Sequence, residues 1–168
     1  MNSDTNIDTP SDRTQPMTRE FTEAMQPADI LAQSGFFADL TPRQLERVAA
    51  ISAVQDCAQG QQVYRIADPA NLVYVLLHGT VRHSIGFGGR HAGVGDILRR
   101  GEVFGWAALT PSCPVRLANA SCLSPCRFLV IDGARLIALM EQDHTLGYRL
   151  MTQLNRLITG TLTAFAGG

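Results

Sequence analysis

Short apolar runs separated by turn residues fill the middle of the chain. Between residues 52 and 132, apolar and polar side chains alternate with the two-residue period of strands, and Gly, Pro and Asp stand between the runs. Strands are therefore expected near 52–57, 61–66, 72–78, 80–86, 93–98, 117–122 and 126–132. This number of short strands at this spacing predicts a roll, a jelly roll or a barrel.

Helical patterns stand on both sides of this β region. A short helix is predicted over 28–34. The sequence Thr-Pro-Arg-Gln from Thr41 reads as a capping box with proline at the first helical position, so a second helix begins there. After the strands, one helix is predicted over 133–142, and Asp143 caps a longer helix that runs to about residue 165.

The last predicted helix has an apolar face wider than one contact surface. Its apolar side chains span an arc of about 160°, whereas a helix lying on one surface needs about 100°. We expect this face to cover the β region and also to meet a second copy, which gives a homodimer. The residues assigned to the dimer contact are Leu150, Leu154, Leu157, Ile158 and Phe165.

The length and composition fit one domain. The chain has 168 residues, of which 45% are hydrophobic and 17% charged, as in ordinary globular proteins. Residues 1–25 carry little apolar surface and are predicted to be a disordered tail. The domain is predicted over 26–168, with a β-roll at about 52–132 and C-terminal helices at about 133–165. The fold class is mostly β with flanking helices: a double-stranded β-helix, or jelly-roll-like β-roll, with N-terminal helices and a C-terminal helix pair.

Charge and apolar content exclude several kinds of partner. The net charge of -1 provides no basic surface for nucleic acid or an anionic membrane. The sequence contains no run of about 18 apolar residues and no signal-peptide pattern at its start, so a cytoplasmic location is expected. All 14 basic residues are arginine, which excludes a Walker-type phosphate loop and a lysine Schiff base.

Four cysteines are present, at positions 57, 113, 122 and 126. In a cytoplasmic chain they are expected to stay reduced. Strand parity puts Cys122 and Cys126 on the same face as apolar neighbours in the two predicted strands. We interpret both as small core residues, and a metal or redox pair is the alternative.

One segment carries most of the functional information. Residues 101–132 read GEVFGWAALTPSCPVRLANASCLSPCRFLVID: a glycine turn, a short apolar run, a Pro-bounded loop, one arginine and two strands. This arrangement resembles the phosphate-binding cassette of the cyclic-nucleotide-binding domain family, which includes the catabolite activator protein. The resemblance extends over about residues 31–165 and includes SGFFADLTPRQLERVA and VYVLLHGTVRHSI.

The resemblance implies where a ligand would bind. In the family a short helix presents backbone N–H groups to the anion and an arginine binds the cyclic phosphate, a role that falls on Arg116. The family's ribose-binding glutamate is replaced by Trp106, so weak or altered nucleotide binding is expected. Glu102 lies too far upstream to replace it and is interpreted as a solvated turn residue. The implied ligand-binding residues are Gly105, Trp106, Ala107, Ala108, Arg116 and Leu117.

The residues leave more than one interpretation open. Arg116 either binds a ligand phosphate or occupies a surface or salt-bridged position at the start of a strand. In one hairpin the family usually has a glycine before an aspartate, and this chain has Ala67 at that position. The geometry of this turn is therefore left open by the sequence. Three histidines, at 78, 83 and 91, raise the possibility of a metal site, but their spacing is not a cupin motif.

Three functions compete on these residues. The leading interpretation is a stand-alone sensory or regulatory domain that acts on a protein partner, with a cyclic nucleotide or another small anion as ligand. It has no cofactor or metal, no catalytic residue, and no helix-turn-helix for DNA. The alternatives are a degenerate domain that serves as a dimeric interaction module, and a cupin-like metal enzyme. The ligand, the partner and the pathway are not identified by the sequence.

Overall fold

Two antiparallel sheets form the body of the computed structural model, which describes residues 25–87, 90–91, 96–112 and 114–166. The first sheet has the strand order β1-β9-β3-β7, and the second has the order β2-β8-β4-β5 with β6 also paired to β4. The strands are β1 (Ser52–Cys57), β2 (Gln62–Tyr64), β3 (Leu72–His78), β4 (Val81–Phe87), β5 (Arg90–His91), β6 (Asp96–Leu98), β7 (Val103–Phe104), β8 (Ala118–Cys122) and β9 (Cys126–Asp132).

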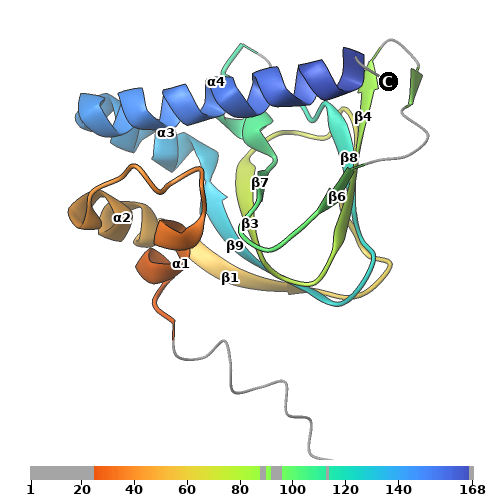
Figure 1. Cartoon of the computed structure of the whole chain (residues 1–168), viewed down its shortest axis with the longest axis horizontal. Coiled ribbons are helices and arrows are strands. Elements are labelled where there is room, and N and C mark those ends of the chain that lie inside the picture. The colour runs from red at the N-terminus through yellow and green to blue at the C-terminus, as the bar shows by residue number, and fades with distance from the viewer. Residues whose placement is uncertain (1–24, 88–89, 92–95, 113, 167–168) are drawn as a thin grey trace, which may run out of the picture.

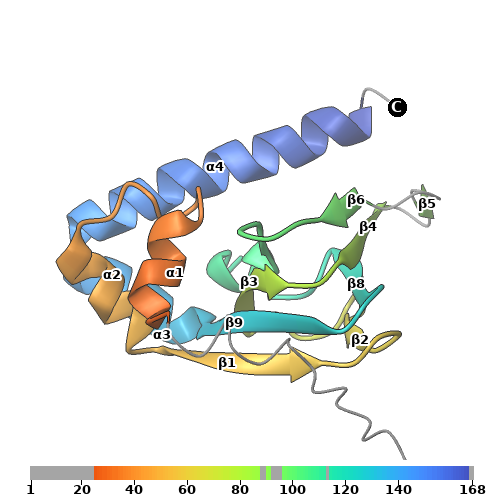
Figure 2. The ribbon, with the colours of Figure 1, turned by 60° about the horizontal axis from the view of Figure 1, so that its bottom comes forward.

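Helices cover one end and one side of this β-roll. Figure 1 shows α1, α2 and α3 gathered at one end, while α4 runs across the roll. In Figure 2, α4 lies on the side of the roll opposite to β1 and β9. The helices are α1 (Pro27–Gln33), α2 (Pro42–Ala49), the short 3-10 helix η1 (Trp106–Leu109), α3 (Gly133–Gln142) and α4 (His144–Ala166). The fold class predicted from the sequence is confirmed.

Local capping chemistry explains where the helices begin. At the start of α2, the Thr41 hydroxyl accepts a hydrogen bond from the Gln44 amide at 3.3 Å, and the Gln44 side chain accepts one from the Thr41 amide at 3.1 Å. Asp132 accepts from the Arg135 amide at 2.9 Å and caps α3. Asp143 accepts from the Leu146 amide at 3.0 Å at the start of α4. The predicted capping box and the predicted Asp143 cap are confirmed.

The first sheet separates two hydrophobic cores. Successive side chains of a strand point to opposite faces, so in β3 Val73 and Val75 pack toward the helices while Tyr74 and Leu76 point into the roll. The core between this sheet and the helices is called the helix-side core, and the core inside the roll the roll interior. β9 alternates in the same way. Both faces of β3 and β9 are therefore buried, whereas β1 at the edge of the sheet is largely exposed.

Most predicted strands match those of the structure. The strands expected at 52–57, 72–78 and 126–132 are β1, β3 and β9 with the same bounds. The strand expected at 93–98 is described only as β6, over 96–98, and residues 93–95 lie outside the described residues, as does the predicted disordered tail up to residue 24. The strand β7 was not predicted, because two residues are too few for a periodic signal.

The Ala67 turn is built with a left-handed residue. Ala67 has a φ of 71°, a conformation that glycine adopts without strain. The Ala67 amide donates to the Arg116 carbonyl at 2.9 Å, and the Arg116 amide donates to the Asp68 carbonyl at 2.8 Å. The departure from glycine therefore leaves the turn intact, and the turn holds the backbone of Arg116.

The buried side of α4 belongs to the chain's own helix-side core. Leu150 and Leu154 are 1% and 2% exposed there, so the prediction that these two residues contact a second copy is wrong. Leu157 and Ile158 are half-buried and line cavities between α4 and the roll. The side chain of Phe165 lies outside the described part of the chain. Within the described ranges, no helix combines the length and the apolar content that crossing a bilayer requires.

Candidate ligand site

A glycine with a left-handed backbone begins η1. Gly105 has a φ of 76°. A Cβ atom at this position would lie 2.8 Å from Nη1 of Arg116 and 3.0 Å from the Leu72 carbonyl oxygen. Glycine is therefore required both by the turn and by the close approach of the Arg116 side chain. The predicted short helix after this glycine is η1.

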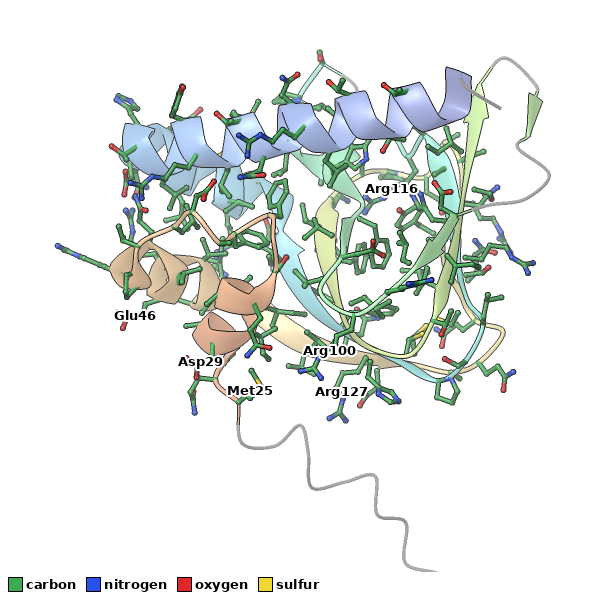
Figure 3. The ribbon with its side chains drawn as sticks, viewed as in Figure 1. Met25, Asp29, Glu46, Arg100, Arg116 and Arg127 are labelled. Carbon is green, nitrogen blue, oxygen red and sulfur yellow. The ribbon has the colours of Figure 1, made fainter. Side chains whose placement is uncertain are left out.

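The Arg116 side chain is buried and points into the roll. Only 3% of the residue is exposed, and Figure 3 shows it inside the roll beneath α4. Its Nη1 donates to the Gly105 carbonyl and its Nη2 to the Leu72 carbonyl, both at 2.8 Å. Its Nε is buried with no hydrogen-bond partner among the described residues. Nε is therefore the one guanidinium nitrogen without a hydrogen bond to the described residues.

Aromatic rings lie against the Arg116 guanidinium, in the place where a carboxylate partner would be expected. The guanidinium carbon lies 4.4 Å from the centroid of the Tyr64 ring and 5.6 Å from that of Tyr74. The two ion pairs found in the described residues join Arg47 to Asp143 and Arg127 to Asp56, and neither includes Arg116. The interpretation of Arg116 as a surface or salt-bridged residue is therefore wrong.

Burial sets the electrostatics of this group. Loss of water contact lowers the pKa of the Arg116 guanidinium, and the opposing effects of Tyr64, Tyr74 and Asp68 are smaller. Burial also raises the pKa of the Tyr64 and Tyr74 phenols, so both stay neutral. A buried cation without an anionic partner is costly, and an anion placed here would gain from it.

The space beside Arg116 is small. The cavity has a volume of about 30 Å³, which fits a water molecule and is far below the roughly 300–1,000 Å³ of small-molecule sites. Five of the six predicted site residues line it; Ala108 packs instead in the helix-side core, beside Gly133. The lining residues are Tyr64, His83, Ile85, Gly105, Trp106, Ala107, Arg116, Leu117, Ala118, Ile158 and Thr161.

A larger cavity shares part of the same lining. It has a volume of about 450 Å³ and lies between α4 and the roll, where Arg156, Leu157, Asp96 and Glu102 contribute to its wall. Trp106, His83 and Thr161 line both cavities. The half-buried Trp106 is thus placed where the two spaces approach each other.

The aromatic residues around Arg116 were not predicted as part of the ligand site. Tyr64, Tyr74 and Phe104 form an aromatic cluster in the roll interior, with the rings of Tyr74 and Phe104 stacked at 5.0 Å between centroids. His83 contacts the edges of this cluster. Strand parity indicates that Tyr74 faces inward, but nothing in the sequence indicates that these strands bring their rings to Arg116.

Other candidates fall outside this site. Glu102 is exposed and accepts from the Arg99 amide, so it is a solvated turn residue as predicted, although it also lines the larger cavity. His78 is exposed on β3, while the side chain of His91 lies outside the described residues. Among the described residues, no three His, Cys, Asp or Glu side chains group as a metal site. Cys122 and Cys126 are buried core residues as predicted.

Comparison with known proteins identifies a family over a range that includes the site residues 105–117. The family model described as "Cyclic nucleotide-binding domain" matches residues 54–143. The "Putative potassium channel protein" of Rhodopseudomonas palustris is 26% identical over 131 residues, which are 78% of this chain and 30% of that protein. The chain therefore spans under a third of that relative's length.

Solved structures have the same fold. A "Putative Cyclic nucleotide-binding protein" from Geobacter metallireducens GS-15 has a TM-score of 0.70 at 25% identity, covering 82% of this chain and 98% of the other. The catabolite activator protein of Thermus thermophilus has a TM-score of 0.64 at 20% identity, covering 78% and 61%.

Proposed function

The chain belongs to the cyclic nucleotide-binding domain family, and we propose that it is a regulatory member whose nucleotide site is closed. In this proposal the domain has weak or no affinity for cyclic nucleotides and acts through a protein partner. It carries out no catalysis and needs no cofactor. The observation that carries the proposal is the small cavity beside Arg116, whose guanidinium is already engaged within the chain.

A nucleotide can enter this site only if the conformation around Arg116 changes, which costs free energy. The cavity of about 30 Å³ is too small for a nucleotide, so it would have to widen or join the neighbouring cavity of about 450 Å³, with which it shares Trp106, His83 and Thr161. Nη1 and Nη2 of Arg116 each donate one N–H to a backbone carbonyl, and their second N–H groups and Nε are the donors left for a phosphate oxygen. These bonds would survive, but the phosphate needs space beside the buried guanidinium that this conformation does not provide.

Trp106 weakens the site further in this proposal. The family's glutamate would supply a charged hydrogen bond to the ribose, which is worth about 1.5–3 kcal/mol. Its loss corresponds to about ten- to a hundredfold in affinity. The indole of Trp106 also adds bulk to the wall of the cavity. Both effects act in the same direction.

The C-terminal helix is the route by which the site would affect a partner. Ile158 and Thr161 of α4 line the cavity that contains Arg116, and α4 lies over that side of the roll (Figure 3). A ligand that enlarges the cavity therefore has to move α4 or contact it. The potassium-channel relative matches this chain over 30% of its length, which supports a domain of this kind acting on a larger effector.

The exposed face of α4 is proposed to pair with a second copy. Tyr148 and Met151 are 75% and 47% exposed, although both are large apolar side chains. With the exposed Asn155 they follow the three-four spacing of a coiled-coil seam. This face replaces the one predicted from Leu150 and Leu154.

A degenerate interaction module is the second candidate. The observation that favours it is the same guanidinium, which binds two carbonyls and a tyrosine ring without needing an anion. In that case the cavity stays closed in every state, and the fold serves only to present its surface.

Calorimetric titration with cyclic AMP, cyclic GMP and cyclic dinucleotides tests the proposal. Trp106 is the only tryptophan, so its fluorescence reports whether the cavity is occupied. The proposal requires that each nucleotide binds this protein weakly or gives no heat of binding in the titration. Tight binding of any of these nucleotides by the natural protein would contradict it.

A further inference from the structure

Three buried thiols lie together at one end of the roll. Cys57 ends β1, Cys122 ends β8 and Cys126 begins β9. All three belong to the roll interior, and their exposures are 6%, 1% and 4%. The three sulfur atoms therefore come from both sheets, although the sequence separates Cys57 from the other two by more than sixty residues.

Two of these sulfur atoms are in very close contact. The Cys122 thiol donates to the Cys57 sulfur at a Sγ–Sγ distance of 3.0 Å. A disulfide bond is about 2.0 Å long, so the two atoms have to approach by only about 1 Å for a bond to form. Cys57 lies in the first sheet and Cys122 in the second.

Backbone hydrogen bonds hold the two strand ends in this position. The turn Ala58–Gln61 follows Cys57 directly, and its Gly60 amide donates to the Cys122 carbonyl at 2.8 Å. The Cys122 amide donates back to the Gln61 carbonyl at 2.9 Å. The two cysteines are therefore positioned by a short hydrogen-bonded connection, and not by side-chain contact alone.

The third thiol, Cys126, also neighbours Cys122 and helps to raise its pKa, but its own hydrogen bonds go to backbone carbonyls. Cys126 donates to the Ser124 carbonyl at 3.2 Å and to the Thr80 carbonyl at 3.4 Å. It also packs against Gly79, where a Cβ atom would lie 2.7 Å from its sulfur. These contacts direct the Cys126 thiol to the hairpin turn, and the 3.0 Å Sγ–Sγ contact therefore favours Cys57 as the partner of Cys122.

We propose that Cys57 and Cys122 form a reversible disulfide, a covalent link between the two sheets of the roll. The oxidant is a small disulfide such as glutathione disulfide. The Cys57 thiolate attacks one of its sulfur atoms and releases one thiolate. Cys122 then loses its proton and attacks the Cys57 sulfur, which forms the link and releases the second thiolate. Two protein thiols are oxidised, and one small disulfide is reduced to two thiols.

The order of these steps follows from burial. Cys57 is the more exposed of the two residues and meets the oxidant first. Burial and the neighbouring thiols raise the pKa of Cys122, so its attack is the slower step. The inference does not depend on the affinity for nucleotides, because neither sulfur lines the cavity beside Arg116.

Refolding in glutathione buffers tests the link without the barrier of burial. The test protein carries Cys113→Ser and Cys126→Ser, which leaves only the two proposed partners. The reduced, unfolded protein is refolded over a series of glutathione and glutathione disulfide ratios, and the folded reduced protein is incubated in the same series. Both routes are expected to reach the same oxidised fraction, with two thiols lost per chain in a thiol titration.

Mass spectrometry and melting identify the bond. Cleavage after arginine is expected to give a linked pair of peptides, 48–65 and 117–127, which separates on reduction. The oxidised protein is expected to melt on the order of 5–10 °C above the reduced one, because the link closes a loop of more than sixty residues. Dithiothreitol should reverse this shift.

Matched variants test whether the link is specific to Cys57 and Cys122. A protein with Cys113→Ser and Cys122→Ser keeps Cys57 and Cys126 and is expected to retain both thiols at ratios that oxidise the first protein. If that variant fails to fold, Cys113→Ser with Cys57→Ala supplies the same comparison for Cys122 and Cys126. Equal thiol loss in the variants, links only between chains, or two free thiols after refolding in glutathione disulfide would overturn the proposal.

Discussion

Arg116 donates a 2.8 Å hydrogen bond from Nη1 to the carbonyl of Gly105, the residue whose missing side chain leaves room for that same nitrogen. A Cβ atom on Gly105 would lie 2.8 Å from Nη1. The left-handed turn at the start of η1 and the buried position of the cation are therefore in direct contact, and a side chain at Gly105 would disturb both.

Gly105→Ala is expected to destabilise the fold by about 2–4 kcal/mol. A left-handed alanine costs about 1–2 kcal/mol, and the clash of its Cβ with Arg116 and the Leu72 carbonyl adds to this. Urea denaturation measures the loss. Gly60→Ala is the control, because Gly60 has a φ of 78° and open space around its Cβ. Equal losses in the two variants would show that the contact with Arg116 has no energetic weight.

Trp106→Glu is expected to strengthen cyclic nucleotide binding by about tenfold or more. The change restores the family's charged acceptor and removes the indole from the cavity wall. Calorimetry follows the variants, which have lost the tryptophan fluorescence. Trp106→Gln separates the two effects, since it removes the indole without adding a charge.

The double variant completes this comparison. Adding Arg116→Ala to Trp106→Glu is expected to abolish the gain, because the anion loses its cationic partner. If neither the natural protein nor Trp106→Glu binds a cyclic nucleotide, the closed interaction module is favoured. Tight binding that is unchanged by Trp106→Glu would mean that Trp106 does not face the sugar.

The elements were predictable where the signal is local. The capping box at Thr41 and the cap at Asp143 depend on side chains within three residues, and strand parity placed Cys122 and Cys126 in the core. The resemblance of residues 101–132 to the family's cassette placed Gly105 and Arg116 at the candidate site. In each case the information lies within a short window of sequence.

The closure of the site was not predictable in this way. Tyr64, Tyr74 and Phe104 come from three strands, and only their register brings their rings together beside Arg116. The dimer face was misassigned for a related reason. The width of an apolar arc does not indicate which part of it the chain's own core covers, and here that part includes Leu150 and Leu154.

Ala67→Gly is expected to stabilise the protein by about 0.5–1 kcal/mol. Ala67 has a φ of 71°, which costs a non-glycine residue about 1–2 kcal/mol, while glycine gives back part of this through the unfolded chain. Chemical denaturation measures the gain. Ala58→Gly in the exposed turn after β1 is the control and should be neutral or destabilising. A loss of stability in Ala67→Gly would mean that the turn is not strained.

His83 is expected to make stability fall as the pH decreases below about 6.5. Burial lowers the pKa of this histidine in the folded protein, and the smaller effect of Asp96 raises it. The unfolded chain therefore binds the proton more readily, so the contribution is complete above the unfolded value of 6.5 and is lost through the window below it. Denaturation curves between pH 5 and 8 measure this slope.

Two variants test the assignment of that slope. His83→Gln should flatten it, because the titrating group is gone. Asp96→Asn should extend it to lower pH, since the carboxylate no longer favours the charged imidazole. An unchanged slope in His83→Gln would assign the effect to another group.

The two faces of α4 are expected to respond differently to the same kind of change. Leu154 is 2% exposed in the helix-side core, so Leu154→Asp should unfold the chain or cost more than about 3 kcal/mol. Tyr148 and Met151 are exposed, so Tyr148→Asp with Met151→Asp should leave the chain folded, with a melting temperature lowered only by the loss of dimer formation. Thermal denaturation separates these outcomes.

The exposed face also determines the oligomeric state in our proposal. Light scattering of the natural protein at tens of micromolar is expected to give the mass of two chains, and of the Tyr148→Asp, Met151→Asp variant the mass of one. The physical reason is that two aspartates per chain would face each other across the seam that Tyr148, Met151 and Asn155 form. Arg156→Ala, on the same helix and lining the larger cavity, is the control and should stay dimeric. A natural protein that is monomeric at this concentration, or a dimer that survives both aspartates, would contradict pairing through this face.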